Sequence, residues 1–250
     1  GQLSAATVEF DVPGLTISGK RREQARQTES EQLGLTNLKG MARLSHNSEE
    51  SVWELALANM SVTYRSDSWQ SFNAHVLFTP DQLVEIAADH LDLGLLTRLA
   101  SDSGVLPEDA ATDLKGLNPD GYLQNVSLSL PVSEAAGRPL TLKTNIADLQ
   151  LGSVRNSPNL WGMDGFVELE FDPSFQHLTG VAEVNSSDFS MNIPSTFTRV
   201  WDYSRVNGRL HIDVSMANGQ VVKLASDRIV AESDAVNGSV RFTSVTERFA

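Results

Sequence analysis

The chain contains no cysteine, and this absence removes several kinds of chemistry at once. Disulfide bridges, zinc sites built on thiolates and cysteine nucleophiles are all excluded. The sequence also lacks any apolar run approaching the roughly eighteen residues that a membrane-spanning helix needs. No basic and apolar leader opens it. Gly1-Gln2-Leu3 resembles the scar of an excised segment, so we expect any membrane anchor to lie outside these 250 residues.

Basic residues are scarce. There are 19 Lys and Arg residues against 32 Asp and Glu residues, which gives a formal net charge of -13. Because phosphate backbones repel such a chain, we expect no nucleic-acid partner. The one basic cluster, Lys20-Arg21-Arg22, stands beside Glu23 in a polar stretch and is typical of a solvated loop.

Recognisable catalytic motifs are missing as well. The sequence has no G-x-S-x-G, Walker or dinucleotide-binding motif. Glu168 and Glu170 flank Leu169 and form a carboxylate pair that would suit glycoside hydrolysis, but a solvated strand face is the simpler interpretation. We therefore expect no enzymatic activity, no cofactor and no metal. The histidines are too far apart in sequence for metal-ligand spacing and occur at His46, His75, His90, His177 and His211.

Helical periodicity is confined to one stretch between Ile86 and Leu130. Leu93, Leu95, Leu96 and Leu99 have helical spacing. Further along, Pro107 suits a first turn and Gly116 a C-terminal stop. These signals predict two short helices, at 93–102 and 107–115, with Leu114 and Leu117 packing inward.

The remainder alternates between apolar and polar residues, which predicts antiparallel strands. Turn signals separate the strands at Asp172-Pro173, Asn207-Gly208, Asn218-Gly219 and Asn237-Gly238. The polar stretch from Ser18 to Gln32 has no apolar period and is predicted to be a loop. We expect one β-rich domain over 1–250, with sub-units at 1–85 (strands), 86–121 (helical insertion) and 122–250 (repeating β units).

A short pattern recurs in which a small or polar residue precedes Asp or Asn and an apolar residue follows. Asp and Asn are poor strand residues but favour bends, so each copy is predicted to mark a kink in a long strand. The spacing of about 40 residues between late copies suggests stacked β units. The acidic or amide position of each copy is Asn37, Asn59, Asp89, Asn125, Asp148, Asp188 and Asp227.

Two short helices cannot cover the apolar faces of so many strands. Either two sheets close on each other as a sandwich, or part of one face stays open as a groove. A closed β-sandwich would suit a binding module for carbohydrate or a protein ligand, with Trp53, Trp69, Trp161 and Trp201 as candidate sugar contacts. An open face would suit fatty acyl chains.

Three stretches resemble the YhdP group of AsmA-like proteins. The first runs from Ala88-Asp89-His90-Leu91-Asp92-Leu93 through Leu106-Pro107 to Leu117-Asn118-Pro119-Asp120-Gly121. The second is Pro158-Asn159-Leu160-Trp161-Gly162, continuing to Gly165. The third is Phe189-Ser190-Met191-Asn192-Ile193-Pro194 followed by Asn207-Gly208-Arg209-Leu210. Together they cover most of 33–245 in the order of the family, although His211-Ile212-Asp213-Val214 stands where the family usually has a tryptophan.

This resemblance implies a long, curved antiparallel sheet folded like a taco, with an open apolar groove and the two short helices at one edge. It also implies a middle segment of a conduit that carries phospholipid between the inner and outer membranes. The conduit would be anchored in the inner membrane of a Gram-negative bacterium and extend into the periplasm. Phospholipid or fatty acyl chains and neighbouring segments of the same larger chain would be its partners. The predicted groove residues are Val167, Leu169, Phe171, Phe189, Met191, Ile193, Leu210, Ile212, Val214, Val222, Leu224, Val240 and Phe242.

Overall fold

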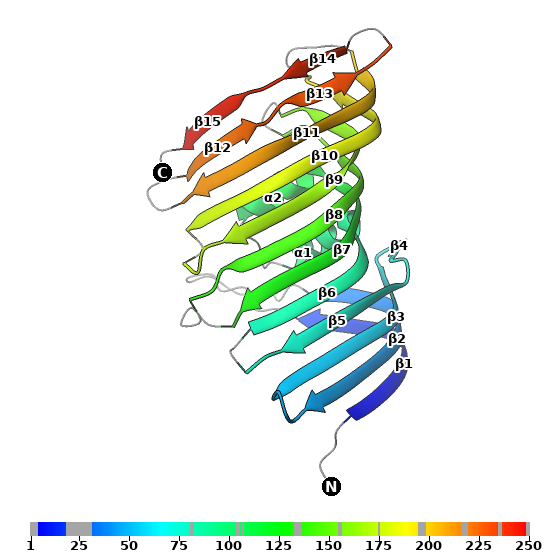
Figure 1. Ribbon diagram of the computed structural model, residues 1–250. Helices are drawn as coiled ribbons and strands as arrows, with labels where there is room; N and C mark the ends of the chain where they lie inside the picture. The colour runs from blue at the N-terminus through cyan, green and yellow to red at the C-terminus, as the bar shows by residue number, and fades with distance from the viewer. Residues whose placement is uncertain are drawn as a thin grey trace, which may run out of the picture.

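Over the residues that it describes, the computed structural model shows a single open sheet of fifteen antiparallel strands with one helical hairpin (Figure 1). The structure describes residues 5–18, 32–80, 83–103, 106, 108–132, 137–154, 157–174, 176–194, 199–216, 220–234 and 237–248. Most of the stretch predicted to be a loop at Ser18 to Gln32 lies outside these residues, as do Pro107 and Asn218-Gly219. The prediction of an elongated, curved antiparallel sheet is confirmed, and the closed sandwich is wrong.

The strands follow one another along the chain with short connections. Those of the first half are β1 (Ala5–Ser18), β2 (Gln32–Asn47), β3 (Val52–Tyr64), β4 (Asp67–Ser68), β5 (Phe72–Phe78) and β6 (Leu83–Asp92). After the helices come β7 (Asp120–Pro131), β8 (Leu140–Leu151), β9 (Asn159–Phe171), β10 (His177–Asn192) and β11 (Trp201–Ser215). The last are β12 (Gln220–Ser226), β13 (Ile229–Glu232), β14 (Asn237–Val240) and β15 (Thr243–Arg248).

Neighbours in sequence are almost always neighbours in the sheet. The hydrogen-bonded order is β1-β2-β3-β5-β6-β7-β8-β9-β10-β11-β12-β15, with β4 beside β3, and with β13 and β14 continuing the pairing beside β11. Strands β1 and β15 therefore stand at opposite ends of the stack.

The register aligns one apolar residue from every strand of the path between β1 and β12. We call this line the central row. Its members are directly opposite one another in each strand pair, so they share one face of the sheet. The central row consists of Ala6, Leu44, Leu55, Val76, Ile86, Leu128, Leu142, Leu169, Gly180, Ile212 and Leu224.

The opposite face carries cross-strand ion pairs. The Nζ of Lys143 lies 2.8 Å from a carboxylate oxygen of Glu168, directly across from it on β9. The Nε2 of His75 lies 2.9 Å from Oε1 of Glu54, and this hydrogen bond lowers the pKa of Glu54. The side chains in these two pairs are about half exposed, so they solubilise this face and contribute little to stability. The predicted solvated position of Glu168 agrees with this arrangement.

Most of the long strands bend near their middle, and asparagine or aspartate occupies many of the bends. These residues have a positive φ, which L side chains other than Asn and Asp rarely adopt. Five of the seven predicted kink residues are in this conformation: Asn37 (φ 51), Asn59 (φ 52), Asn125 (φ 52), Asp148 (φ 50) and Asp188 (φ 60). Asp89 and Asp227 do not share it, although Asp227 falls in the break between β12 and β13.

The bend at Asn59 also inserts one residue relative to β5 and so switches which alternate positions face inward. In β3, Leu55 and Leu57 precede Asn59, and Met60 and Val62 follow it. The register shifts between Leu57 and Met60, yet their partners Ala74 and Phe72 remain two residues apart on β5. Leu57 and Met60 therefore point to the same side. The bulge keeps one face apolar across the bend.

At the bends, some backbone N–H groups have no carbonyl partner in the neighbouring strand, and they donate to polar side chains instead. The N–H of Asn59 donates to Oδ1 of Asn73 (3.0 Å), and the N–H of Asn73 donates to Oδ1 of Asp89 (2.9 Å). Burial alone would raise the pKa of Asp89, but these bonds from Asn73 outweigh it and leave the pKa lowered. Farther along, the N–H of Asp148 donates to Oδ1 of Asp164 (2.8 Å).

Two predicted turns are not turns. Asn207-Gly208 lies inside β11, and Gly208 serves close packing, because a Cβ there would stand 2.6 Å from Cγ1 of Ile229. Asn237-Gly238 lies inside β14, where Oδ1 of Asn237 accepts a bond from the N–H of Ser233 (3.2 Å) and closes the preceding turn. Phe242, predicted to share a strand with Val240, falls between β14 and β15.

The helical prediction is confirmed, with small shifts at the ends of the second helix. Helix α1 spans Leu93–Asp102 and α2 spans Glu108–Leu117, one residue beyond the predicted stop at Gly116. Leu95 is 1% exposed, whereas Leu114 and Leu117 are only half-buried. The hairpin connects β6 to β7 and contacts both strands.

Replacing the N-cap of α1 should weaken the fold measurably. Oδ1 of Asp92 accepts a hydrogen bond from the N–H of Leu95 (2.7 Å), which satisfies a donor that the helix cannot satisfy itself. We expect Asp92→Ala to lower the free energy of unfolding by about 1 kcal/mol and Asp92→Ser to lower it less. Urea denaturation followed by circular dichroism measures both. Equal losses would show that the cap bond does not stabilise α1.

Candidate functional site

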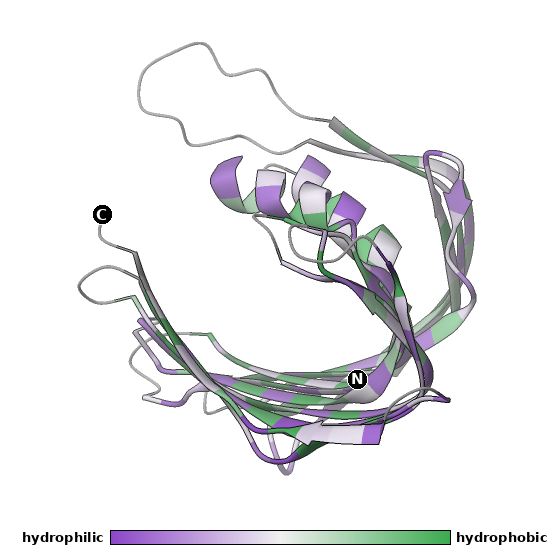
Figure 2. Ribbon diagram, turned by 90° about the horizontal axis from the view of Figure 1, so that it is seen from above, coloured by the Kyte–Doolittle hydropathy of each residue, from purple (hydrophilic) through white to green (hydrophobic). Residues whose placement is uncertain are grey.

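The apolar face of the sheet is the concave face. Seen along the stack of strands, the sheet is a curved wall with the α1–α2 hairpin on its inner side (Figure 2). The hydroxyl of Tyr64, at the end of β3, donates to Oδ2 of Asp102 on α1 (2.8 Å), so Tyr64 points to the inner side. Tyr64 shares its face with Met60, and Met60 shares its face with Leu57. The central row therefore lines the hollow, which we call the trough.

The trough is long and open. Twelve strands on the main path, spaced about 4.8 Å apart, give it a length of about 50 Å. The accessible surface of the chain is 15866 Å², whereas a compact protein of its mass exposes about 11,000 Å². Trp53 and Phe78, a cross-strand pair beside the central row, remain 45% and 43% exposed. An apolar surface of this extent is characteristic of a binding surface.

The structure brings most of the predicted groove residues together on one wall of the trough. Leu169, Ile212 and Leu224 belong to the central row. Two further rows run parallel to the central row, one on each side of it and two positions away along each strand. The first row contains Phe171, Leu178, Val214 and Val222. The second row contains Val167, Ala182 and Leu210.

The remaining predicted residues lie outside these three rows. Phe189 and Met191 on β10 pair with Tyr203 and Trp201 on β11. Val240 on β14 pairs with Ile229. Ile193 follows the end of β10, and Phe242 lies in the break where its N–H donates to Oγ of Ser226 (2.8 Å). Phe189 is buried, whereas Val240 is exposed.

Sequence reasoning missed two groups of residues that belong to the same surface. The first is the N-terminal half of the central row, such as Leu55, Ile86 and Leu142, whose alternation is as regular as that of the second half. The second is the pair Trp201 and Tyr203, whose neighbours Asp202 and Ser204 give the same alternating signal. Register, which sequence alone does not supply, shows that the first group shares one face with the predicted residues of the central row.

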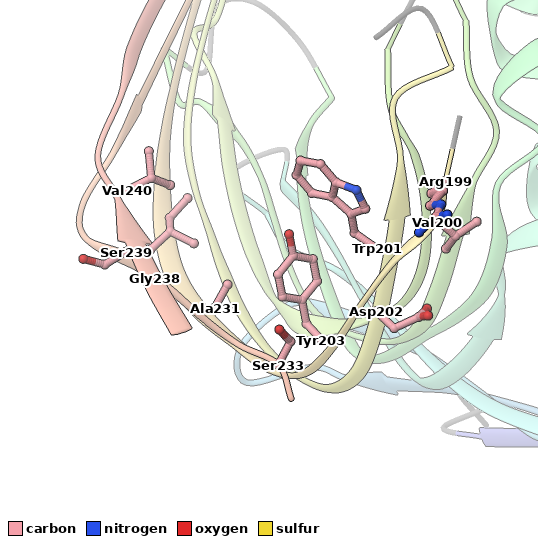
Figure 3. Close-up of a pocket in the computed structure, with 11 residues that line it drawn as sticks. Arg199, Val200, Trp201, Asp202, Tyr203, Ala231, Ser233, Gly238, Ser239 and Val240 are labelled. Atoms are coloured by element: carbon pink, nitrogen blue, oxygen red, sulfur yellow. The ribbon is translucent and has the colours of Figure 1, made fainter. Parts of the chain in front are cut away.

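A cavity of about 690 Å³ lies at the C-terminal end of the trough. Trp201 and Tyr203 project into it from β11, and Val240 points toward them from β14 (Figure 3). Ile229 and Ala231 on β13 also line it, as does Arg199. The rings of Tyr203 and Phe189 are 6.1 Å apart. Burial raises the pKa of Tyr203.

The geometry offers little for catalysis or metal binding. Among the residues that the structure describes, His, Asp and Glu side chains form no group of three that would hold a metal ion. His177 pairs with Asp213 at 3.1 Å and His211 with Asp227 at 3.5 Å, each with about half of its side chain exposed. In the described part of the chain, no helix combines the length and hydrophobicity that crossing a bilayer requires.

Comparison with known families agrees with this shape. The profile of one family, described as YhdP protein, matches residues 1–246. The chain belongs to the YhdP family. The YhdP family is a transport-type family of bacterial envelope proteins, and its members are related to lipid transport. A search of curated proteins gave no match, and neither did a search of solved structures.

Proposed function

We propose that this chain is a segment of a lipid conduit in which the acyl chains of phospholipids lie along the trough. The observation that carries the proposal is the central row, an unbroken line of apolar residues that crosses the sheet from β1 to β12 and faces an open hollow. A surface of this kind binds without directional chemistry. The segment needs no catalytic residue.

The energy available from the trough is sufficient for lipid binding. Each methylene moved from water to an apolar surface contributes about 0.8 kcal/mol, so a fully covered sixteen-carbon chain gains about 10 kcal/mol before the cost of ordering. The trough is open on one side, so the gain is smaller. Weaker binding suits movement, because a conduit must also release its cargo.

The uniformity of the rows supports movement along the trough. An acyl chain lying across Leu142 and Leu169 meets the same kinds of atoms when it shifts to Ile212 and Leu224. Neighbouring positions therefore have similar binding free energies, and the barrier between them is low. The continuity of the sheet fits a role in which neighbouring segments of a longer chain extend the same surface. An inner-membrane anchor outside these residues, with this part of the chain in the periplasm, completes the proposed arrangement.

A carbohydrate-binding module is less compatible with the geometry. Trp53 and Trp201 are far apart in the stack, on β3 and β11, so they cannot form one sugar platform. Strong sugar sites also need buried polar groups beside the rings. The C-terminal cavity has Trp201 and Tyr203 side by side, but Ile229, Ala231 and Val240 surround them.

Lipid that copurifies with the chain tests the proposal. We expect native mass spectrometry of a gently purified sample to show bound phospholipid, and a fluorescent fatty acid to bind the delipidated chain. Thin-layer analysis of an extract identifies the headgroup. A lipid-free chain that also fails to bind the fatty acid would contradict the conduit.

A further inference from the structure

The α1–α2 hairpin carries a second hollow, of about 330 Å³, whose lining is cationic. Arg65, Arg98 and Lys115 contribute three positive charges, and Asp102 is the carboxylate among the lining residues. Ser101 and Asn118 add uncharged polar groups. Such an excess of cations is unexpected in a chain whose net charge is -13.

The cations of this hollow share few carboxylates. Oδ2 of Asp102 lies 2.8 Å from Nη2 of Arg65 and also accepts the hydrogen bond of Tyr64, while Oδ1 lies 3.5 Å from Nζ of Lys115. Arg98 pairs with Asp67 through Nη2 at 3.1 Å. Its Nε is buried and has no acceptor among the residues that the structure describes. If these three cations served only to hold the α1–α2 hairpin on the sheet, fewer of them would be needed.

Tyr64 connects the hollow to the trough. Tyr64 is 5% exposed, it pairs with Leu35 on the concave face, and its hydroxyl is bonded to Asp102 in the lining of the hollow. A molecule with an apolar part in the trough therefore places a polar end near Arg65, Arg98 and Lys115. Two guanidinium groups and an ammonium suit a phosphate, because guanidinium donors pair with its oxygens in a bidentate manner.

We propose that this cationic hollow binds the phosphate of a lipid headgroup whose acyl chains lie in the trough. The inference rests on the proposed function and adds to it a fixed position for the lipid headgroup. The hairpin, which interrupts an otherwise uniform surface, then becomes a stopping point where lipids with and without phosphate are distinguished.

Three soluble probes test the site on the 250-residue chain by isothermal titration calorimetry at low salt. They are dihexanoyl phosphatidic acid, dihexanoylglycerol, which lacks the phosphate, and glycerol 3-phosphate, which lacks the tails. We expect phosphatidic acid to bind about tenfold more tightly than dihexanoylglycerol, and added salt to reduce this preference. Glycerol 3-phosphate should bind more weakly than phosphatidic acid because it gains nothing from the trough.

Charge variants assign the preference to residues. Arg98→Gln combined with Lys115→Gln should abolish it and leave dihexanoylglycerol binding unchanged. Arg98→Lys combined with Lys115→Arg should keep it, which separates loss of charge from loss of fold. Lys143→Gln, which removes a cation paired with Glu168 on the convex face, should also keep it.

The outcomes separate the two proposals. Equal binding of phosphatidic acid and dihexanoylglycerol, or an unchanged preference in the Arg98→Gln and Lys115→Gln variant, would overturn the headgroup site and leave the trough intact. Equal binding of glycerol 3-phosphate and phosphatidic acid would assign the hollow to free phosphate esters instead. Failure of both lipids to bind would overturn the conduit and the headgroup site together.

Discussion

Ile212→Glu is expected to lower the affinity of the chain for fatty acid by about 100-fold while the sheet remains folded. Ile212 stands in the central row between Gly180 and Leu224, in contact range of any acyl chain that lies along the trough. A carboxylate there must either lose its water or exclude the ligand, and about 3 kcal/mol of lost binding is a modest estimate of that cost. Because Ile212 is only half-buried, the unliganded protein can hydrate the new charge.

Ala225→Glu is the matched control for Ile212→Glu. Ala225 is adjacent to Leu224 on β12 and pairs with His211 on the convex face, so the same charge is added outside the trough. Titration of both variants with a fluorescent fatty acid, alongside thermal melts, measures binding and folding together. If Ile212→Glu unfolds while Ala225→Glu does not, Ile212 belongs to a closed core and the trough assignment fails.

Insertion of one alanine directly after Asp148 is expected to destabilise the sheet by about 4 kcal/mol or more. Asp148 is the positive-φ residue of the bulge in β8, and the register shifts between Ile146 and Leu149. With one more residue in the bend, the alternation beyond it shifts by one position, so Leu149 and Leu151 turn from the concave to the convex face. Leu149 is 6% exposed, and exposure of such side chains costs about 2 kcal/mol each.

Asp148→Gly separates the geometry of the bend from its side chain. Glycine adopts φ 50 without strain and retains the N–H that donates to Asp164, so the free energy of unfolding should change by less than about 1 kcal/mol. Urea denaturation of the insertion and the glycine variant gives the comparison. An insertion as mild as the substitution would show that the number of residues in the bend does not fix which face is apolar.

Much of the architecture is predictable from local sequence because the alternation of apolar and polar residues can be recognised within each strand by itself. Leu140, Leu142 and Ile146 indicate a strand without reference to any other part of the chain, and the leucines around Leu95 likewise indicate a helix. The kink residues were predictable for a related reason. Asn and Asp are the side chains that tolerate the left-handed conformation, so Asn59 and Asp188 indicate where a long strand bends.

The features that could not be predicted depend on contacts between residues far apart in the sequence, which a local pattern does not indicate. Asn207-Gly208 has the composition of a hairpin turn, but the close approach of Ile229 explains Gly208. The cationic hollow was missed because Arg65 and Lys115 are separated by 50 positions in the sequence and meet only when the hairpin folds onto the concave face. The open trough itself is a property of register and curvature. Alternation predicts apolar faces equally well for a sandwich.

The hairpin-by-hairpin order of the strands has a consequence for assembly and growth. Because almost every strand pairs with its neighbour in sequence, most contacts between strands fall within a single hairpin, and folding can begin at any hairpin and spread outward in both directions. The same order makes the length of the molecule adjustable. Duplication of one hairpin would add about 10 Å to the stack without disturbing any existing pair except the one it splits.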